Sequence, residues 1–323
     1  MGPTPSAGQT IAVIGAGAVG AYYGARLAQA GLDTRFLMRR DYEAVQANGL
    51  VVTSPDGDFV LRADVARTSA EIGPVDWVIC ALKTTSLDDV PALVGPCLGP
   101  DTRILCLMNG LGVEERFAEW FGAQRIFAGL AFTCINRGEP GCVNHLRYGA
   151  VTVGHFLNDE SEVQAALDLW QEATVEFTGT ESLLRSRWEK LGWNIPFNGL
   201  CVTGGGITTD HVVGDPDLRA AARRSMQEVA DAGNADLAAH GESSRIDAEA
   251  MIDRMFTLTD AMGVYRPSTV IDFVDGRPME VEEMFGEPLR RAQALGVDTP
   301  HIALLTVLMR RLDSNNLNRS NLG

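Results

Sequence analysis

Lys190, Asn194 and Asn198 follow one another at intervals of four residues in the segment WEKLGWNIPFNGL, residues 188–200. If this segment is helical, the spacing places an ammonium and two amides on one face, each about one turn from the next. The other positions are mostly apolar, as in a core helix. An unpaired buried amide costs about 1–3 kcal/mol, and a buried charge costs more. The polar stripe therefore needs a polar partner.

The two lysines of the chain are candidates for proton transfer. Of its 27 basic residues, only Lys83 and Lys190 are lysine, and the other 25 are arginine. Arginine keeps its proton in proteins, whereas burial can lower the pKa of a lysine ammonium until it becomes a proton donor. A codon-usage bias explains the excess of arginine but not the two exceptions. Each lysine either lies where a group that titrates or a compact positive charge is needed, or it has been retained by chance.

A glycine pattern near the N-terminus predicts a dinucleotide site. The G-x-G-x-x-G motif directly follows an apolar, β-rich run at 10–14 and precedes a helical pattern, which is the context its chemistry requires. The first glycine permits a tight turn, the second lets a pyrophosphate approach the backbone, and the third allows close helix–strand packing. The alternative is a plain glycine-rich turn. The residues assigned to this site are Gly15, Ala16, Gly17, Ala18, Val19 and Gly20.

The end of the second apolar run favours NADP(H) over NAD(H). An NAD site would place a carboxylate there to hold the ribose 2′-hydroxyl, but this chain has Met38-Arg39-Arg40. A carboxylate would repel a 2′-phosphate, whereas two guanidiniums would bind it. Arg39 is the preferred contact, and one arginine of the pair is expected to be a solvated loop charge.

Lys83 and Asn109 follow apolar runs at 77–82 and 103–108. Open α/β sheets bind ligands at the carboxyl ends of their strands, so both residues are candidates for cofactor or substrate binding. For Asn109, which precedes Gly110, the competing interpretation is a turn residue.

The wider pattern predicts how these residues are positioned. Apolar strands alternate with helical segments at 41–48 and 112–121, which indicates βαβ units around a parallel sheet. Gly-punctuated alternation at 139–155 is typical of hairpin strands. We therefore predict an N-terminal Rossmann-type α/β domain over 1–180. The remaining strands are predicted at 10–14, 34–38, 77–82, 103–108 and 126–132.

Strand signals vanish after about residue 181, so residues 181–323 are predicted to form an all-helical domain. Asp215-Pro216 provides an N-cap and first position for a helix that ends near Gly241. The last eleven residues lack apolar periodicity and are predicted to be a frayed tail. Further helices are predicted from Ser243 or Ser244 to Gly263, over 279–295 and over 299–312.

Composition narrows the possible partners and compartment. The formal net charge of −15 argues against nucleic acid and against anionic membrane surfaces as partners. No run approaches 18 uninterrupted apolar residues, so no membrane span is predicted. The six cysteines form no C-x-x-C pair, and most lie in apolar runs, which favours free thiols in a reducing cytoplasm.

Taken in order, these segments resemble the ketopantoate reductase (2-dehydropantoate 2-reductase) family over nearly the whole chain. The pattern W-x-K-L-x-x-N-x-x-x-N, followed about 80 residues later by S-x-x-x-D and then by G-R-P-x-E, is quite specific. The resemblance implies a Rossmann domain joined to a helical domain. The segments that carry it are GAGAVG, LK at 82–83, NG at 109–110, residues 188–198, Ser268 and GRPMEVEEMFG at 276–286.

The resemblance also implies roles for individual residues. Lys190 would be the general acid, and Glu280 would hold the substrate's hydroxyl. Asn194, Asn198 and Ser268 would bind the substrate carboxylate and neighbouring groups, while Asn109 and Lys83 would lie beside the nicotinamide of NADP(H). The partner of the polar stripe would then be a small 2-keto acid, most simply ketopantoate, reduced to pantoate in pantothenate and coenzyme A biosynthesis. Glu282 and Glu283 are interpreted as solvated helix-face charges.

Two other functions remain open at this point. The chain could be another dehydrogenase of Rossmann-plus-helical architecture, acting on a keto or hydroxy acid or an opine. It could also be a non-catalytic NADP-binding sensor, although a pure binder would not need both Lys190 and Glu280. The run Gly204-Gly205-Gly206 departs from the family pattern and could widen the pocket or add mobility. A homodimer is a further possibility that the sequence does not decide.

Overall fold

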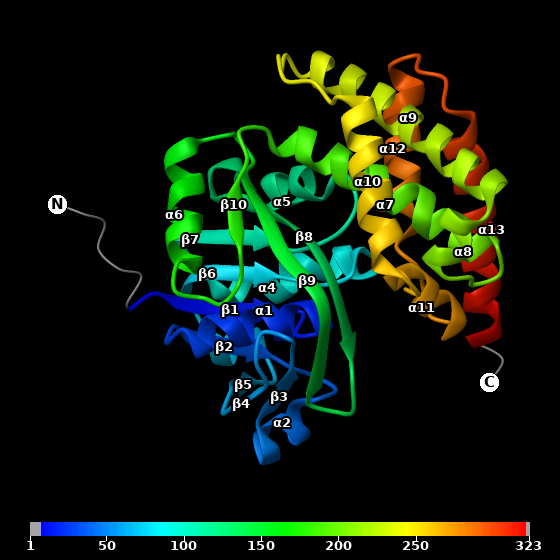
Figure 1. The fold of residues 1–323 in the computed structure, drawn as a ribbon. Helices are drawn as coiled ribbons and strands as arrows, with labels where there is room; N and C mark the ends of the chain where they lie inside the picture. Colours follow the sequence, from blue (N-terminus) through cyan, green and yellow to red (C-terminus); the bar gives the residue numbers. More distant parts are fainter. Residues whose placement is uncertain (1–7, 321–323) are drawn as a thin grey trace. The chain divides into compact units, whose positions relative to one another are not determined.

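The structure of the protein is a computed structural model, in which residues 8–320 are described, with side chains as far as Asn316. The chain divides into two compact units (Figure 1). Unit 1 comprises Met1–Met108 and Val113–Leu183, and unit 2 comprises Asn109–Gly112 and Leu184–Gly323. The predicted fold class, a Rossmann-type α/β region followed by a helical region, is confirmed. The assignment of Asn109–Gly112 to unit 2 was not predicted.

Unit 1 contains a ten-stranded sheet in the order β4-β3-β9-β8-β7-β6-β1-β2-β5, with β10 paired to β9. Neighbouring strands are parallel except for the β3–β4 and β8–β9 pairs. The order β5-β2-β1-β6-β7-β8 matches the doubly wound arrangement, with its switch point between β1 and β6. The strands are β1 Thr10–Ile14, β2 Asp33–Leu37, β3 Leu50–Thr53, β4 Phe59–Leu61, β5 Asp64–Ala66, β6 Val75–Cys80, β7 Leu98–Cys106, β8 Ile126–Arg137, β9 Cys142–His155 and β10 Phe177–Gly179.

Both faces of the central strands are buried, which explains their continuous apolar sequences. In β1, Ile11 and Val13 belong to one core cluster, while Ala12 and Ile14 belong to another. Helices α1 and α6 contribute to the first cluster, and α3, α4 and α5 contribute to the second. The helical segments of unit 1 are α1 Ala18–Gln29, α2 Tyr42–Asn48, α3 Ser69–Ile72, η1 Thr84–Asp89, α4 Val90–Val94, η2 Gly95–Cys97, α5 Val113–Phe121, η3 Ala123–Arg125 and α6 Glu160–Trp170.

The hairpin strands predicted at 139–155 are confirmed in part, because β9 forms a hairpin with β8. This region is one long strand, β9, and its antiparallel partner is the preceding strand β8, with Phe127 opposite His155 and Arg137 opposite Val143. The turn between them is Gly138–Gly141, where the N–H of Gly138 donates to the carbonyl of Cys142 over 3.0 Å. Glycine punctuation within β9 therefore marks irregular register and not a chain reversal.

Unit 2 is helical, and its described residues contain no strand. The predicted start of α9 is confirmed, because the Asp215 carboxylate accepts from the N–H groups of Asp217 at 2.9 Å and Leu218 at 3.0 Å. η4 is a π-helical turn. The helices are α7 Leu183–Thr203, α8 Thr209–Gly214, α9 Pro216–Ala239, α10 Ala248–Met262, α11 Ser268–Val274, η4 Glu282–Gly286, α12 Glu287–Ala294 and α13 Pro300–Ser320.

Two predicted helix starts in unit 2 are wrong. Helix α10 begins at Ala248, not at Ser243 or Ser244, because the Asn234 side chain binds both the N–H and the carbonyl of Ile246 and holds that segment extended. Asp247 then caps the helix. The predicted helix over 279–295 begins only after Glu280 and opens with the π-turn η4 before α12.

The predicted frayed tail is also wrong as far as the described residues reach, because α13 continues to Ser320. Two of its polar side chains make contacts that the sequence pattern did not indicate. The Asp313 carboxylate accepts from the N–H of Met279 over 2.8 Å, and the Asn316 amide donates to the carbonyl of Phe273 over 3.1 Å. These contacts stabilise the last turns without apolar periodicity. Residues 321–323 of the predicted tail lie outside the described residues.

The glycine run ends helix α7. The N–H of Gly205 donates to the carbonyl of Val202, and that of Gly206 donates to the carbonyl of Cys201. Gly205 and Gly206 have φ values of +91° and +88°, which only glycine adopts without strain. The run therefore reverses the chain after α7, and neither a widened pocket nor added mobility is needed to explain it.

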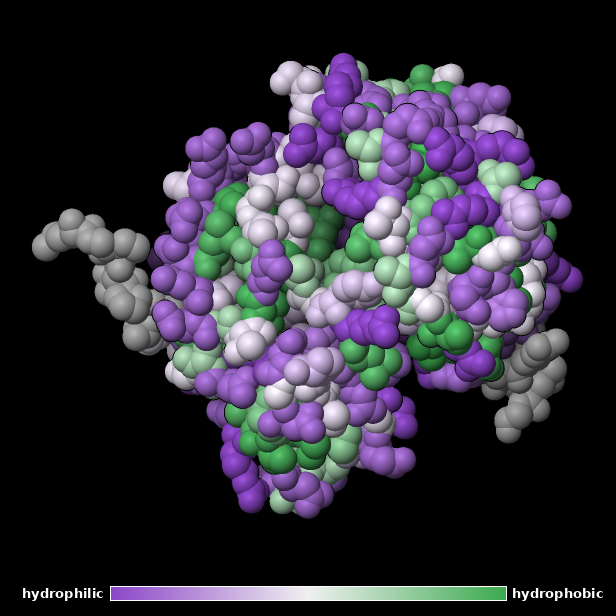
Figure 2. All heavy atoms as spheres, in the orientation of Figure 1, coloured by the Kyte–Doolittle hydropathy of each residue, from purple (hydrophilic) through white to green (hydrophobic). Residues whose placement is uncertain are grey.

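The surface of the described residues carries no obvious membrane segment. None of the helices within residues 8–320 combines the length and apolar character needed to cross a bilayer. Figure 2 shows hydrophilic residues over most of the drawn face, with smaller apolar patches between them. All six cysteines are free thiols, and five of them are buried.

Candidate active site

The glycine motif forms the tight turn that a dinucleotide site requires. Gly15 follows β1 with φ +88°, and the N–H of Gly17 donates to the carbonyl of Gly15 over 2.7 Å. A Cβ at Gly20 would lie 2.4 Å from the Gly15 carbonyl oxygen, so only glycine lets α1 pack this closely. The first and third glycines therefore have the functions that the sequence predicted for them.

The position of the second glycine leaves room for a ligand. A Cβ on Gly17 would meet no atom closer than the Gly15 carbonyl oxygen at 3.9 Å. Gly17 is also the N-cap of α1, and no side chain caps that helix. The first N–H groups of the helix, from Ala18 and Val19 onward, thus remain available for an anion. This arrangement fits a pyrophosphate.

Lys83 lies next to this turn. A Cβ at Gly15 would contact the Leu82 nitrogen at 2.6 Å and the Ala81 carbonyl carbon at 2.7 Å, so the turn packs directly on the residues that follow β6. Lys83 is exposed and caps the short helix η1. The structure therefore brings the glycine motif and the Lys83 segment together at the switch point of the sheet.

Arg39 and Arg40 follow β2 and are both exposed. Most arginines of this acidic chain bind carboxylates or carbonyls, as Arg35 and Arg137 do. Among residues 8–320, neither Arg39 nor Arg40 has a hydrogen-bond or ion-pair partner. Asp41 pairs with Arg137 and is thereby occupied. The two guanidiniums are available to an anionic ligand at the carboxyl end of β2.

The predicted polar stripe is present in unit 2 on α7. Its three residues lie on one helical face, and their exposure decreases along the helix, from the partly exposed Lys190 to Asn194 at 7% and Asn198 at 2%. The intervening side chains of Leu191, Ile195 and Phe197 are buried. The sequence thus correctly predicted that a largely buried helix carries an ammonium and two amides.

Two atoms of the stripe remain without a partner. The Asn198 amide nitrogen donates to the Asn194 carbonyl over 2.9 Å, but Asn198 Oδ1 and Asn194 Nδ2 are buried and form no hydrogen bond within the described residues. The indole N–H groups of the same helix are satisfied, that of Trp188 by Asp236 and that of Trp193 by Thr259. Buried polar atoms are rarely left unpaired. The two amide atoms therefore retain hydrogen-bonding capacity that a polar ligand can satisfy.

Glu280 lies between α11 and η4 and is 6% exposed. Its segment is held on the preceding side by Arg277, whose guanidinium donates to Asp272 over 3.0 Å. The Asp313 carboxylate accepts from the N–H of Met279, the residue directly before Glu280. Burial, together with the nearby carboxylates of Asp272 and Glu282, raises the pKa of Asp313. The backbone around Glu280 is thus fixed from two helices.

The π-turn η4 contacts the segment of Asn109. The N–H of Leu111 donates to the carbonyl of Glu283 over 2.8 Å. A Cβ at Gly110, where φ is +95°, would lie 2.5 Å from Glu283 Cβ. Asn109 is partly buried and its side chain has no partner within the described residues. These contacts place the Asn109 segment close to η4.

The same π-turn contacts two further segments with predicted site residues. Phe285 packs against Gly199, where a Cβ would lie 3.2 Å from its ring, and Gly199 follows Asn198. The Thr269 hydroxyl lies 4.0 Å from the Met284 sulfur, next to Ser268, which is the exposed first residue of α11. The structure thus gathers the segments of Asn109, Asn198, Ser268 and Glu280 around η4. The sequence did not predict that η4 gathers these segments. The one signal that could have suggested it is that η4 begins two residues after Glu280.

Gly110→Ala is expected to destabilise unit 2 by more than backbone strain alone explains. The change combines a positive φ with a backbone clash at Glu283. Gly241→Ala is the matched control, since Gly241 has φ +74° but open space around the added Cβ. Strain alone should cost about 1–2 kcal/mol of unfolding free energy, and Gly110→Ala should exceed the control in denaturant titrations. Equal losses would show that the contact with η4 is not tight.

Known proteins resemble the chain along nearly its whole length. A family model described as ketopantoate reductase PanE/ApbA matches residues 11–158, and the corresponding C-terminal model matches residues 182–313. A 2-dehydropantoate 2-reductase from Nostoc sp. is 38% identical over 94% of this chain and 95% of its own. The crystal structure of 2-dehydropantoate 2-reductase from Geobacter metallireducens is 42% identical, with a TM-score of 0.89 over 94% of this chain and 99% of its own. The enzyme of that name from Methylococcus capsulatus is 31% identical, with a TM-score of 0.84 over 95% and 97%.

Proposed function

Because the chain belongs to the ketopantoate reductase family, we propose that it reduces 2-dehydropantoate to pantoate, with NADPH as the hydride donor. The observation that carries the proposal is the stripe on α7, where buried amide atoms of Asn194 and Asn198 lack partners in the described part of the chain. A small keto acid offers a carboxylate, a carbonyl and a hydroxyl, which can pair with such atoms. The stripe is then a substrate site and not a defect of the core.

Lys190 acts as the general acid in this proposal. The chemistry that NADPH would supply when bound is hydride transfer to the ketone carbon, which would leave negative charge on the carbonyl oxygen. The Lys190 ammonium stabilises that charge and donates its proton to the oxygen. An arginine could stabilise the charge but could not release a proton. This difference explains a lysine at 190 in a chain that otherwise uses arginine almost throughout.

The remaining residues bind and orient the substrate. Glu280, buried and fixed by the contacts of its neighbours, accepts the hydrogen bond of the substrate's hydroxyl. Asn194, Asn198 and Ser268 hold the carboxylate and adjacent groups. Each of these side chains is held on a helix or a clamped segment, which keeps the reacting groups in line.

We assign the nicotinamide cofactor as NADP(H), on the support of Arg39 and Arg40. Within residues 8–320, both guanidiniums are unpaired at the carboxyl end of β2, where an NAD-binding chain would have a carboxylate. The amides at the start of α1 would bind the pyrophosphate, and Lys83 and Asn109 would lie beside the nicotinamide. Free thiols support a reducing compartment such as the cytoplasm. A homodimer stays a possibility that the sequence leaves open.

The decisive experiment is NADPH oxidation with ketopantoate and a panel of related 2-keto acids. We expect the highest kcat/KM for ketopantoate, since its hydroxyl gives Glu280 a partner that simpler keto acids lack. A clear preference for another keto acid would favour a different dehydrogenase of the same architecture. Tight NADPH binding without turnover on any keto acid would instead favour a sensor.

A further inference from the structure

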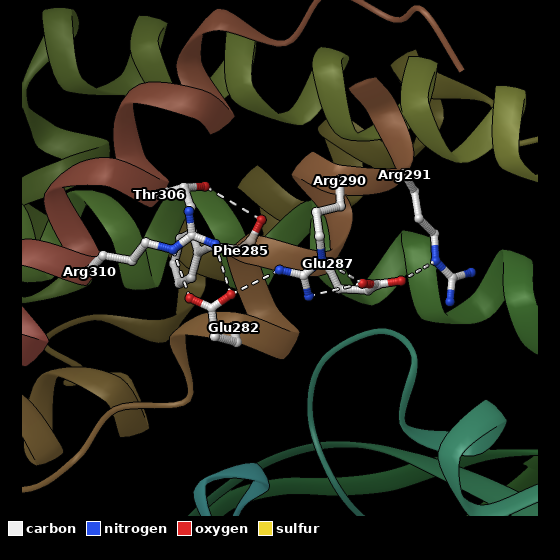
Figure 3. A network of polar contacts seen from close by, with 7 residues as sticks. All are labelled: Glu282, Phe285, Glu287, Arg290, Arg291, Thr306 and Arg310. Atoms are coloured by element: carbon white, nitrogen blue, oxygen red, sulfur yellow. Dashed lines mark hydrogen bonds and ion pairs between the residues drawn. The ribbon is translucent and has the colours of Figure 1, made fainter. Parts of the chain in front are cut away.

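Glu282 is part of an ion-pair cluster that holds the π-turn η4 in place (Figure 3). The Arg310 guanidinium binds its two carboxylate oxygens, with Nε–Oε1 2.7 Å and Nη2–Oε2 2.8 Å. Arg290 adds a third bond to Oε2 over 2.9 Å. A forked arginine–carboxylate pair fixes orientation as well as distance. Glu282 is exposed, as the sequence predicted, but it is not merely solvated.

The rest of η4 is shaped to fit this cluster. A Cβ at Gly286 would lie 2.4 Å from Glu282 Oε2 and 2.9 Å from Arg310 Nη2, so glycine leaves the space that the guanidinium occupies. The Thr306 hydroxyl lies 3.4 Å from the Phe285 carbonyl oxygen and donates over 2.7 Å to the carbonyl of Ile302, in its own helix. Figure 3 shows that Arg310 and Thr306, which both belong to α13, point toward the π-turn η4. π-Turns are rare and often lie at functional sites.

We propose that Glu282 is a positioning residue for the proposed reduction: through Arg310 and Arg290 it fixes η4, and η4 sets the positions of the Asn109 and Glu280 segments. Glu282 lies two residues after Glu280, and the next residue, Glu283, provides the carbonyl that binds the N–H of Leu111. A shift of η4 would therefore move a substrate-binding carboxylate and the Asn109 loop together. Only the expected effect on kinetics rests on the proposed function, whereas the effect of Glu282 on the position of η4 does not.

The stability of the cluster does not by itself explain this arrangement. Glu282 and Arg310 have side-chain exposures of 49% and 43%, and ion pairs at such exposed sites typically contribute little to stability. Hydrogen bonding from Arg310 holds the pKa of Glu282 below its usual range, so the pair is charged at neutral pH. A modest effect on stability combined with a larger effect on catalysis would thus identify positioning.

Glu282→Ala is expected to lower kcat/KM for ketopantoate about ten- to a hundredfold, since small misplacements of reacting groups cost up to that much. The affinity for NADPH should stay within about twofold of wild type, as for other surface changes. Asp260→Ala is the matched control, because Asp260 forms an exposed forked pair with Arg219, at 2.7 and 2.9 Å, between α9 and α10. The control should keep full activity.

A double-mutant cycle separates positioning from general damage. Arg310→Ala should reproduce the kinetic loss, and Glu282→Ala/Arg310→Ala should be no worse than the more damaging single change, because both remove one unit. In a Glu280→Ala background, Glu282→Ala should have little further effect on the KM for ketopantoate. Independent, additive losses in both tests would overturn the proposal.

Amide hydrogen exchange provides a readout that needs no turnover. The N–H of Leu111 is protected by the Glu283 carbonyl, so Glu282→Ala should accelerate exchange at residues 109–112, whereas Asp260→Ala should not. Unchanged protection in Glu282→Ala would overturn the inference even if the wild type reduced no keto acid. A wild type without turnover but with this exchange response would instead contradict the proposed function alone.

Discussion

Lys190→Ala is expected to lower kcat for ketopantoate reduction by about two to four orders of magnitude, the usual range for general acid catalysis. The loss has two parts, because the variant lacks both the proton donor and the charge that stabilises the developing oxyanion. Steady-state kinetics with saturating NADPH measure it. NADPH binding should persist, because the residues predicted to bind the dinucleotide are unchanged and, apart from Asn109, lie in unit 1.

Lys190→Arg separates the two parts. The guanidinium keeps the positive charge but cannot release its proton. The variant should therefore bind ketopantoate better than Lys190→Ala while its kcat stays far below that of the wild type. Thermal unfolding of both variants controls for damage to α7. Full activity in either variant would remove Lys190 from the role of general acid.

The chemistry-bearing residues were visible in the sequence because their spacing reflects a local element. Lys190, Asn194 and Asn198 share a face through helical periodicity alone, and the positive φ of Gly15 and its close approach to Gly20 arise within the turn itself. The Asp215 cap of α9 could be predicted for the same reason. Local rules of this kind need no knowledge of what the element packs against.

Features that depend on distant residues could not be predicted in this way. Helix α13 continues past residue 312 because Asp313 and Asn316 bind backbone groups more than 30 residues earlier in the chain. Helix α10 starts late because Asn234, on α9, holds the backbone of Ile246. In each case a polar side chain without apolar periodicity makes a tertiary contact. The sequence pattern contained no signal for either partner.

The π-turn is the clearest example of this limit for the candidate site. Glu282 and Glu283 look like two adjacent surface charges, and periodicity gives them no other role. In the structure, the side chain of Glu282 binds two arginines and the backbone of Glu283 binds the Asn109 segment. Which residues bind substrate could thus be proposed from sequence, but what holds them in place required the fold.

Replacing Arg39 and Arg40 together with alanine is expected to reduce kcat/KM for NADPH about a hundredfold while leaving that for NADH nearly unchanged. A hydrogen bond to a charged group contributes about 1.5–3 kcal/mol, and each 1.4 kcal/mol corresponds to about tenfold in affinity. NADH lacks the 2′-phosphate, so it loses none of these bonds. The ratio of the two kcat/KM values measures the effect.

Arg62→Ala is the matched control for this prediction, because Arg62 is likewise exposed and unpaired among the described residues of unit 1. It precedes β5, which runs parallel to β2, and Asp64 is paired in register with Arg35. Arg62 therefore lies beyond the amino ends of these strands, whereas Arg39 and Arg40 lie beyond the carboxyl end of β2. Of the single variants, Arg39→Ala should show most of the loss. Equal losses for NADPH and NADH would contradict the 2′-phosphate assignment, since a general loss of positive charge or of stability would weaken both nucleotides alike.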